Sequence, residues 1–284
     1  MSRKKSVILW IVSLLIMLSA AVFQRMTGPT YPQSGSVSIG GKEIKYSLIR
    51  SEVTEKDAMI NIVCDKSISG KIMYKILSAN MDWITAPMKR NGDTLTAAIP
   101  WLEPAGKVQY FITLIDAAGK EYQLNKEETR VRFKGHVPDA ILLPHIFFMF
   151  IAFWFSIRTA FEAIFKGDNA FKYSIWTLAA MFIGGIILGP IVQKFAFGAY
   201  WTGWPFGNDL TDNKTALAFI SWIVAVWRLK KDNKKALWPV LAAVISLAMY
   251  LIPHSTLGSQ LDYSGRDIPA RYMNTSSTFT EQAQ

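Results

Sequence analysis

The stretch AILLPHIFFMFIAFWFSI, residues 140–157, is eighteen residues long and contains no Asp, Glu, Lys or Arg. A helix rises 1.5 Å per residue, so this run approaches the ~30 Å thickness of a hydrocarbon layer. The chain of 284 residues is 51% hydrophobic and 18% charged, with a mean hydropathy of +0.20. Such values are high for a soluble domain. Four further apolar runs are Val7–Phe23, Tyr173–Val192, Thr215–Trp227 and Ala236–Ile252. The sequence therefore predicts an α-helical membrane protein with about five transmembrane helices.

A polar stretch of over a hundred residues separates the first two apolar runs, and it has the pattern of an all-β domain. Alternating or β-rich segments recur at short spacing, and Gly-rich turns such as Asn91-Gly92-Asp93 separate them. This pattern predicts an inserted two-sheet sandwich over residues 36–134. The expected strands are Lys42–Ile49, Ala58–Cys64, Lys71–Leu77, Trp83–Met88, Thr94–Ile99, Lys107–Ile115, Glu121–Leu124 and Thr129–Phe133.

The segment PAGKVQYFITLIDAAGKEYQL, residues 104–124, closely resembles the late strands of fibronectin-III or immunoglobulin-like domains. The resemblance implies that Tyr110 and Ile112 point inward and that Gly119 forms a turn. It implies an interaction or spacer module and no particular chemistry. Because the strands supply their own core, residues 34–134 are expected to fold alone.

The positions of Lys and Arg predict the orientation in the membrane. Basic residues gather before the first run, between the second and third, and between the fourth and fifth, whereas the loop 193–214 is almost neutral. The positive-inside rule therefore predicts a multi-pass protein of the bacterial inner membrane with a cytoplasmic N-terminus. The sandwich, this loop and the C-terminus are then periplasmic. The net charge of +10 reports topology, and its spread over separate loops speaks against nucleic-acid binding.

These boundaries divide the chain into five parts. Residues 1–24 form a transmembrane anchor or a cleaved signal peptide, because Ser19-Ala20-Ala21 has small residues at a suitable spacing. Residues 25–35 form a linker to the sandwich. Residues 138–253 form a four-helix transmembrane bundle, and residues 254–284 form a periplasmic tail that is partly disordered, past Tyr272.

Several kinds of chemistry are excluded or unsupported. Cys64 is the single cysteine, so no intrachain disulfide, CxxC pair or CxxCH haem attachment exists, and a small buried side chain is expected. The chain has no GxSxG, HExxH, P-loop or GxGxxG motif. No catalytic residue is predicted. Gly185 and Gly189, with Gly184 alongside, form a small-residue face that is typical of helix packing.

Histidines near the periplasmic face provide the candidate site. His145 lies inside the second run and His254 ends the fifth, and ionisable side chains within spans often mark function. Two neutral imidazoles on facing helices could ligate haem iron or another metal. Asp209 and Asp212 would then be outer-shell partners or oxygen ligands. The predicted metal ligands are therefore His145, His254, Asp209 and Asp212.

The loop segment YWTGWPFGND, residues 200–209, resembles the tryptophan-rich periplasmic segment of haem-handling proteins in cytochrome c maturation. In that family a histidine near the periplasmic end of a helix flanks the segment on each side. The resemblance implies cofactor binding by Trp201 and Trp204 together with the two histidines. An alternative stays open: the aromatic residues could form an interfacial belt. An N-cap of the next helix could explain Asp212 or Asn213.

Two functions from different classes follow. The leading prediction is a periplasm-facing site for haem b or a transition metal, serving electron transfer or cofactor handling. Such a protein would have a membrane or periplasmic partner in a redox or assembly complex, besides the lipid bilayer. The alternative is a non-catalytic envelope anchor without a cofactor, whose sandwich binds a protein partner.

Overall fold

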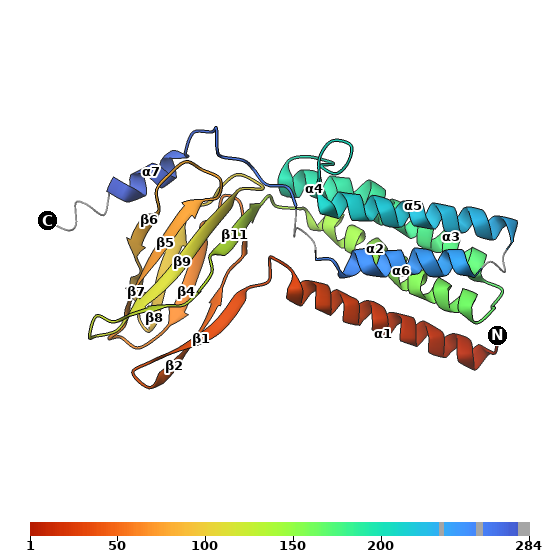
Figure 1. The fold of residues 1–284 in the computed structure, drawn as a ribbon, viewed down its shortest axis with the longest axis horizontal. Helices are drawn as coiled ribbons and strands as arrows, with labels where there is room; N and C mark the ends of the chain where they lie inside the picture. The colour runs from red at the N-terminus through yellow and green to blue at the C-terminus, as the bar shows by residue number, and fades with distance from the viewer. Residues whose placement is uncertain (233–235, 254–257, 278–284) are drawn as a thin grey trace. The chain divides into compact units, whose positions relative to one another are not determined.

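The computed structural model describes residues 1–232, 236–253 and 258–277, and the chain forms two compact units. The helical unit comprises Met1–Pro29 and Val137–Ser259. The β-rich unit comprises Thr30–His136 and Gln260–Gln284. Figure 1 shows the long helices of the first unit side by side and the strands of the second. The expected combination of apolar helices with β-sheets is confirmed.

The helical unit is a bundle in which α2 packs against α3 and α6, and α5 packs against both of these helices. Helix α1 packs against α2 and α6. A π-helical segment, η1, joins α3 to α4 within one continuous rod. The helices are α1 (Arg3–Thr27), α2 (Asp139–Ile164), α3 (Ala170–Met181), η1 (Phe182–Leu188), α4 (Gly189–Phe197), α5 (Leu210–Lys231) and α6 (Leu237–Leu251).

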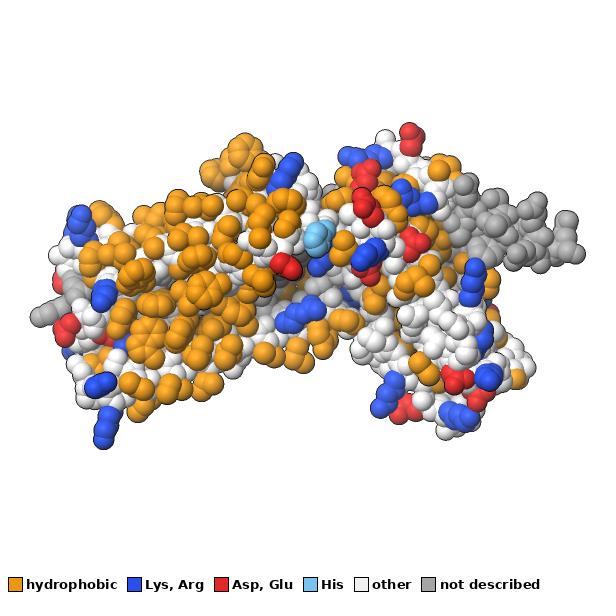
Figure 2. Space-filling view, turned by 180° about the vertical axis from the view of Figure 1, so that it is seen from behind, with side chains coloured by type: hydrophobic (Ala, Val, Ile, Leu, Met, Phe, Trp, Pro, Cys, Tyr) orange, Lys and Arg blue, Asp and Glu red, His pale blue; other side chains and the backbone are white. Residues whose placement is uncertain are grey.

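Hydrophobic side chains cover the outside of the helical unit, as Figure 2 shows for one face. Leu15, Trp176 and Ile223 are examples, each more than two fifths exposed. A surface of this kind is stable against lipid and not against water. The bundle therefore has the exterior expected of a membrane-embedded unit.

Three described helices are long and apolar enough to cross a membrane by length and composition: Arg3–Thr27, Asp139–Ile164 and Ala170–Phe197. Helix α6 is apolar but has only fifteen residues, and α5 is absent from this group. The sequence-based number of about five spans is therefore not reached by these criteria alone. The reason is that α5 begins with a polar turn and ends in a basic one.

A buried ion pair joins three helices at the end of α2. Arg158 and Glu162 lie one turn apart with their charged atoms 2.6 Å apart, and both side chains are almost fully buried. Arg158 donates to Ser6 Oγ of α1 at 3.1 Å and stacks over the rings of Trp10 and Tyr173. Removing one partner of such a pair typically costs about 3–5 kcal/mol. The pair therefore fixes α1 and α3 against α2.

The β-rich unit contains three sheets around one hydrophobic core. In the largest sheet the order is β3-β11-β9-β5-β6, with β10 also on β9, and the smaller ones are β4-β8-β7 and β1-β2. The strands are β1 (Gln33–Ile39), β2 (Lys42–Leu48), β3 (Ser51–Val53), β4 (Ala58–Val63), β5 (Ser69–Ile76), β6 (Ile84–Pro87), β7 (Lys89–Asn91), β8 (Thr94–Ile99), β9 (Lys107–Ile115), β10 (Glu121–Gln123) and β11 (Thr129–Lys134).

The centre of the core comes from β5 and β9, which pair antiparallel with Ile72 opposite Ile112. Tyr110 and Ile112 are fully buried, in agreement with the inward orientation that the resemblance implied, and Cys64 is a buried free cysteine. The predicted linker 25–35 is partly wrong, because α1 continues to Thr27 and β1 begins at Gln33. β1 was not predicted because it has only two apolar residues, Val37 and Ile39, too few to establish an alternation.

The C-terminal segment completes this core. Tyr263 and Tyr272 are almost fully buried among the strand residues, and the Tyr272 hydroxyl donates to the carbonyl of Pro100. Tyr272 lies on α7 (Ala270–Ser277), so the predicted disorder past Tyr272 does not hold as far as Ser277. Residues 34–134 therefore lack part of the core that the prediction of independent folding assumed.

Replacing Tyr272 with alanine is expected to destabilise the β-rich unit by about 3–5 kcal/mol, the range for truncating a buried aromatic ring. Pulse proteolysis of the full-length protein in detergent would measure the change. The control is Met59→Ala, because Met59 is 45% exposed on β4 and should change stability by less than about 1 kcal/mol. Equal effects of the two substitutions would show that the C-terminal segment is not part of the core.

Candidate functional site

A histidine of α2 meets the π-helical segment inside the bundle. His145 Nδ1 lies 2.9 Å from the carbonyl oxygen of Gly184, which also accepts the backbone N–H of Gly189. A carbonyl can only accept, so Nδ1 carries the proton and the neutral ring keeps a lone pair on Nε2. Within the described residues Nε2 has no hydrogen-bond partner. This is the tautomer and orientation that metal-ligating histidines commonly have.

The turn from α4 to α5 is organised by two carboxylates. Asp209 is the N-cap of α5 and accepts from Thr211 N at 2.8 Å. Its other oxygen accepts from the backbone N–H and the hydroxyl of Ser259, each at 2.9 Å, and from Thr202 Oγ1 at 3.3 Å. Burial opposes ionisation, but these hydrogen bonds outweigh it and hold the pKa of the Asp209 carboxyl below its usual value. Asp209 therefore holds the loop to the bundle.

Asp212 binds the loop with one oxygen only. Its Oδ2 accepts from the backbone N–H groups of Thr202 and Gly203 at 2.7 and 2.9 Å, and from Gln193 Nε2 at 3.0 Å. All hydrogen bonds of Asp212 go to Oδ2. The side chain is almost completely buried. Its Oδ1 is therefore an oxygen donor that the loop does not use.

A cavity of about 130 Å³ lies between α2, the η1–α4 segment and α5. The structure brings four of the predicted site residues to its wall. They are His145, Trp201, Asp209 and Asp212. Trp204 is 77% exposed and does not line the cavity, although its carbonyl accepts the indole N–H of Trp201. His254 lies outside the described residues.

Sequence reasoning missed three residues of this wall. Gln193 lies in an apolar run, where its polarity was a signal. Met149 follows His145 by four residues and so shares its helix face. Thr215 also lines the cavity. No group of three His, Cys, Asp or Glu side chains close enough to share a metal occurs among residues 1–232, 236–253 and 258–277.

The tip of the loop presents aromatic side chains away from this network. Tyr200, Trp204 and Phe206 are 59%, 77% and 83% exposed. Asn213 Oδ1 accepts from Trp204 N at 2.7 Å and so fixes the tip. Such exposed rings fit an interfacial belt, whereas the carboxylates beneath them line the cavity. The loop thus has an outer aromatic side and an inner polar side.

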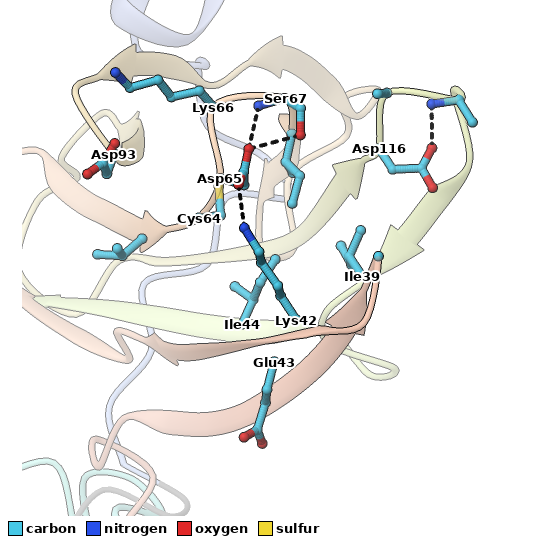
Figure 3. A pocket seen from close by; sticks show the side chains of 15 residues that line it. Ile39, Lys42, Glu43, Ile44, Cys64, Asp65, Lys66, Ser67, Asp93 and Asp116 are labelled. Atoms are coloured by element: carbon cyan, nitrogen blue, oxygen red, sulfur yellow. Dashed lines mark hydrogen bonds and ion pairs between the residues drawn. The ribbon is translucent and has the colours of Figure 1, made fainter.

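The β-rich unit has a separate open cleft of about 830 Å³ (Figure 3). Ile39 and Ile44 of the β1–β2 hairpin form one apolar wall. Lys42, also on the cleft wall, forms an ion pair with Asp65, with Nζ 2.9 Å from Oδ2. This ion pair and the hydrogen bonds from Ser67 hold the pKa of the Asp65 carboxyl below its usual value. The volume of the cleft lies in the range of small-ligand sites.

Comparison with known proteins adds no relative: no protein-family model matches the chain, and no curated protein matches it significantly. Its function is therefore inferred from the residues and their contacts.

Gly203→Ala is expected to disrupt the loop, because a Cβ there would lie 2.6 Å from Asp212 Cβ and 2.7 Å from Asn213 Oδ1. Overpacking of this kind costs about 1–3 kcal/mol. The substitution should lower the melting temperature of the detergent-purified protein and speed proteolysis between α4 and α5. Gly265→Ala is the control, because open space surrounds that position. If Gly203→Ala behaves like this control, the carboxylate network does not hold the loop.

Proposed function

We propose that the protein is an integral membrane protein that binds a transition-metal ion in the cavity beside His145. The observation that carries the proposal is the fixed tautomer of His145, whose Nδ1–H donates to Gly184 and leaves Nε2 as a ligand. Asp212 Oδ1 is the second donor atom on the same cavity wall. Imidazole and carboxylate are common ligands of first-row metals.

The size of the cavity favours an ion over haem b, the other cofactor indicated by the sequence. Its 130 Å³ accommodates an ion with a few waters. Sites for larger cofactors typically occupy about 300–1,000 Å³. Because the described residues contain no group of three His, Cys, Asp or Glu side chains that could share a metal, water would complete the coordination.

The role that we propose for the metal is electron transfer or cofactor handling at the periplasmic face of the inner membrane. A bound transition metal supplies a redox or ligand-exchange centre. The protein residues orient it: Gly184 fixes the ring of His145, and Gln193 fixes the carboxylate of Asp212. Asp209 and Thr202 close the loop over the cavity.

We further propose five spans, with the β-rich unit and the C-terminus in the periplasm. Residues 30–136 and 260–277 share one core, so they must lie on the same side of the membrane. An even number of crossings must therefore separate His136 from Gln260. Helix α2 and the α3–η1–α4 segment supply two, and α5 and α6, packed in the same bundle, supply two more. By the positive-inside rule, the basic residues of the loops place the N-terminus in the cytoplasm in this proposal.

The cleft of the β-rich unit supports a second function, that of an envelope anchor whose β-sandwich binds a protein partner. The cleft has an apolar wall and charged residues at its rim, including Lys42 and Asp65. Combined apolar and polar surfaces of this kind are typical of protein interfaces. This function would not require a metal.

Elemental analysis of the detergent-purified protein tests the metal proposal. His145→Ala should abolish or sharply lower the bound metal, because it removes an inner ligand, and Asp212→Asn should weaken binding. Asp209→Asn should act less severely, because both Asp209 oxygens already bind the loop. His136→Ala is the control, because it precedes α2. Unchanged metal content in His145→Ala, or no metal in the wild type, would contradict the proposal, and a Soret band would indicate haem.

Reporter fusions test the topology. Fusions after Arg158 and after Lys231 should report the cytoplasm, whereas fusions after Gly92 and after Tyr263 should report the periplasm. Opposite locations for Gly92 and Tyr263 would contradict the even number of crossings.

A further inference from the structure

A methionine accompanies the histidine of the candidate site. Met149 follows His145 by one helical turn, so both side chains project from the same face of α2. Both line the 130 Å³ cavity. They also share a glycine: the Gly184 carbonyl accepts from His145 Nδ1, and a Cβ on Gly184 would lie 3.2 Å from Met149 Sδ.

The glycines allow this close approach. A Cβ on Gly184 would lie 3.0 Å from both the Met149 backbone nitrogen and Phe148 Cβ, and one on Gly185 would lie 2.9 Å from Thr215 Cγ2. Any side chain there would push α2 or α5 away. The π-helical segment therefore brings the histidine ring and the thioether together against one backbone. Segments of this kind occur frequently at functional sites.

More thioethers lie immediately beyond. A second cavity, of about 40 Å³, adjoins the first, because Met149 and Thr215 line both. Its wall contains three methionines: Met149, Met181 and Met249. Met181 also approaches Gly185, since a Cβ on that glycine would lie 3.9 Å from Met181 Cγ. Soft sulfur donors therefore line the second cavity, which shares Met149 with the His145 cavity.

The charge near these sulfurs favours an ion of low charge. Lys214 lines the second cavity, is almost completely buried, and donates from Nζ to the carbonyl of Ile252 at 2.5 Å. Repulsion by a nearby ammonium group doubles when the charge of the ion doubles. Neutral thioethers add no negative charge there, and the carboxylates of Asp209 and Asp212 line the first cavity but not the second. Thioether ligands select Cu(I) among the biological transition metals.

We infer that the metal of this site is copper, held as Cu(I) by His145 Nε2 and Met149 Sδ, with Met181 as a further sulfur ligand. This inference rests on the proposed metal-binding function and names its metal. It also assigns a ligand role to Met149 and Met181. The carboxylate of Asp212 then lies on the hard, water-facing side of the same cavity.

The test is an anaerobic titration of full-length protein in detergent with Cu(I), against a colorimetric Cu(I) chelator, and in parallel with Zn(II). Wild type should bind one equivalent of Cu(I). Met149→Leu, which nearly conserves volume and so should fold, should weaken Cu(I) binding by more than about tenfold, the scale on which ligand-shell changes act. Its affinity for Zn(II) should stay within about threefold, because protein zinc ligands are thiolates, imidazoles and carboxylates rather than thioethers. Met59→Leu, on β4 in the other unit, is the matched control and should bind Cu(I) like wild type.

The other outcomes separate the two proposals. If the protein binds Zn(II) through His145 but does not bind Cu(I), the copper inference is overturned and the metal site stands. Cu(I) binding that is unchanged in both Met149→Leu and Met181→Leu also overturns it. If neither metal binds wild-type protein, the proposed function fails together with the inference.

Discussion

The burial of Tyr263 and Tyr272 in the core of the β-rich unit constrains the whole chain. These residues follow the last helix of the bundle, whereas the strands that enclose them precede the second helix. A shared core cannot form across a bilayer. In the proposed topology the two flanks of residues 137–259 therefore lie on one side of the membrane, and an even number of crossings connects them. The shared core sets the parity of the crossings, whereas the charge pattern predicts which side faces the cytoplasm.

Polar groups inside the helical unit divide between two ends of the bundle. At one end Arg158 and Glu162 form a buried ion pair that ties α1 and α3 to α2. At the other end, Asp209 and Asp212 bind the loop, yet His145 Nε2 and Asp212 Oδ1 each keep a lone pair that could bind a metal ion. The first two side chains face each other as a charge pair, whereas His145 and Asp212 line one cavity. This arrangement supports a structural role for the first pair and a ligand-binding role for the second.

Much of the β-rich unit could be predicted because its strands alternate strongly. Lys107–Ile115 and Thr94–Ile99 were predicted to the residue, since apolar side chains occupy every second position and turns bound both. The short strand Lys89–Asn91 could not be predicted, because three polar residues have no period. Tyr272 packs against a surface made by strands distant in the sequence, and the polar sequence around it has no pattern that predicts this packing.

The candidate site was predictable in its residue types but not in its geometry. A histidine within an apolar run and carboxylates before the next one indicated His145, Asp209 and Asp212, and these residues line one cavity. The π-helical segment was not predictable, because its glycines also fit ordinary helix packing. Trp204 points away from the cavity because the same loop that buries Asp212 turns its tip outward.

X-ray absorption spectroscopy of the metal-loaded, full-length protein tests the central claim most directly, because the scattering pattern of a coordinated imidazole is distinct from that of oxygen or sulfur ligands. We expect an imidazole signature in the wild type that disappears in His145→Gln, whichever metal is bound. A spectrum without imidazole scattering, or one that His145→Gln leaves unchanged, would contradict the assignment of His145 as a metal ligand.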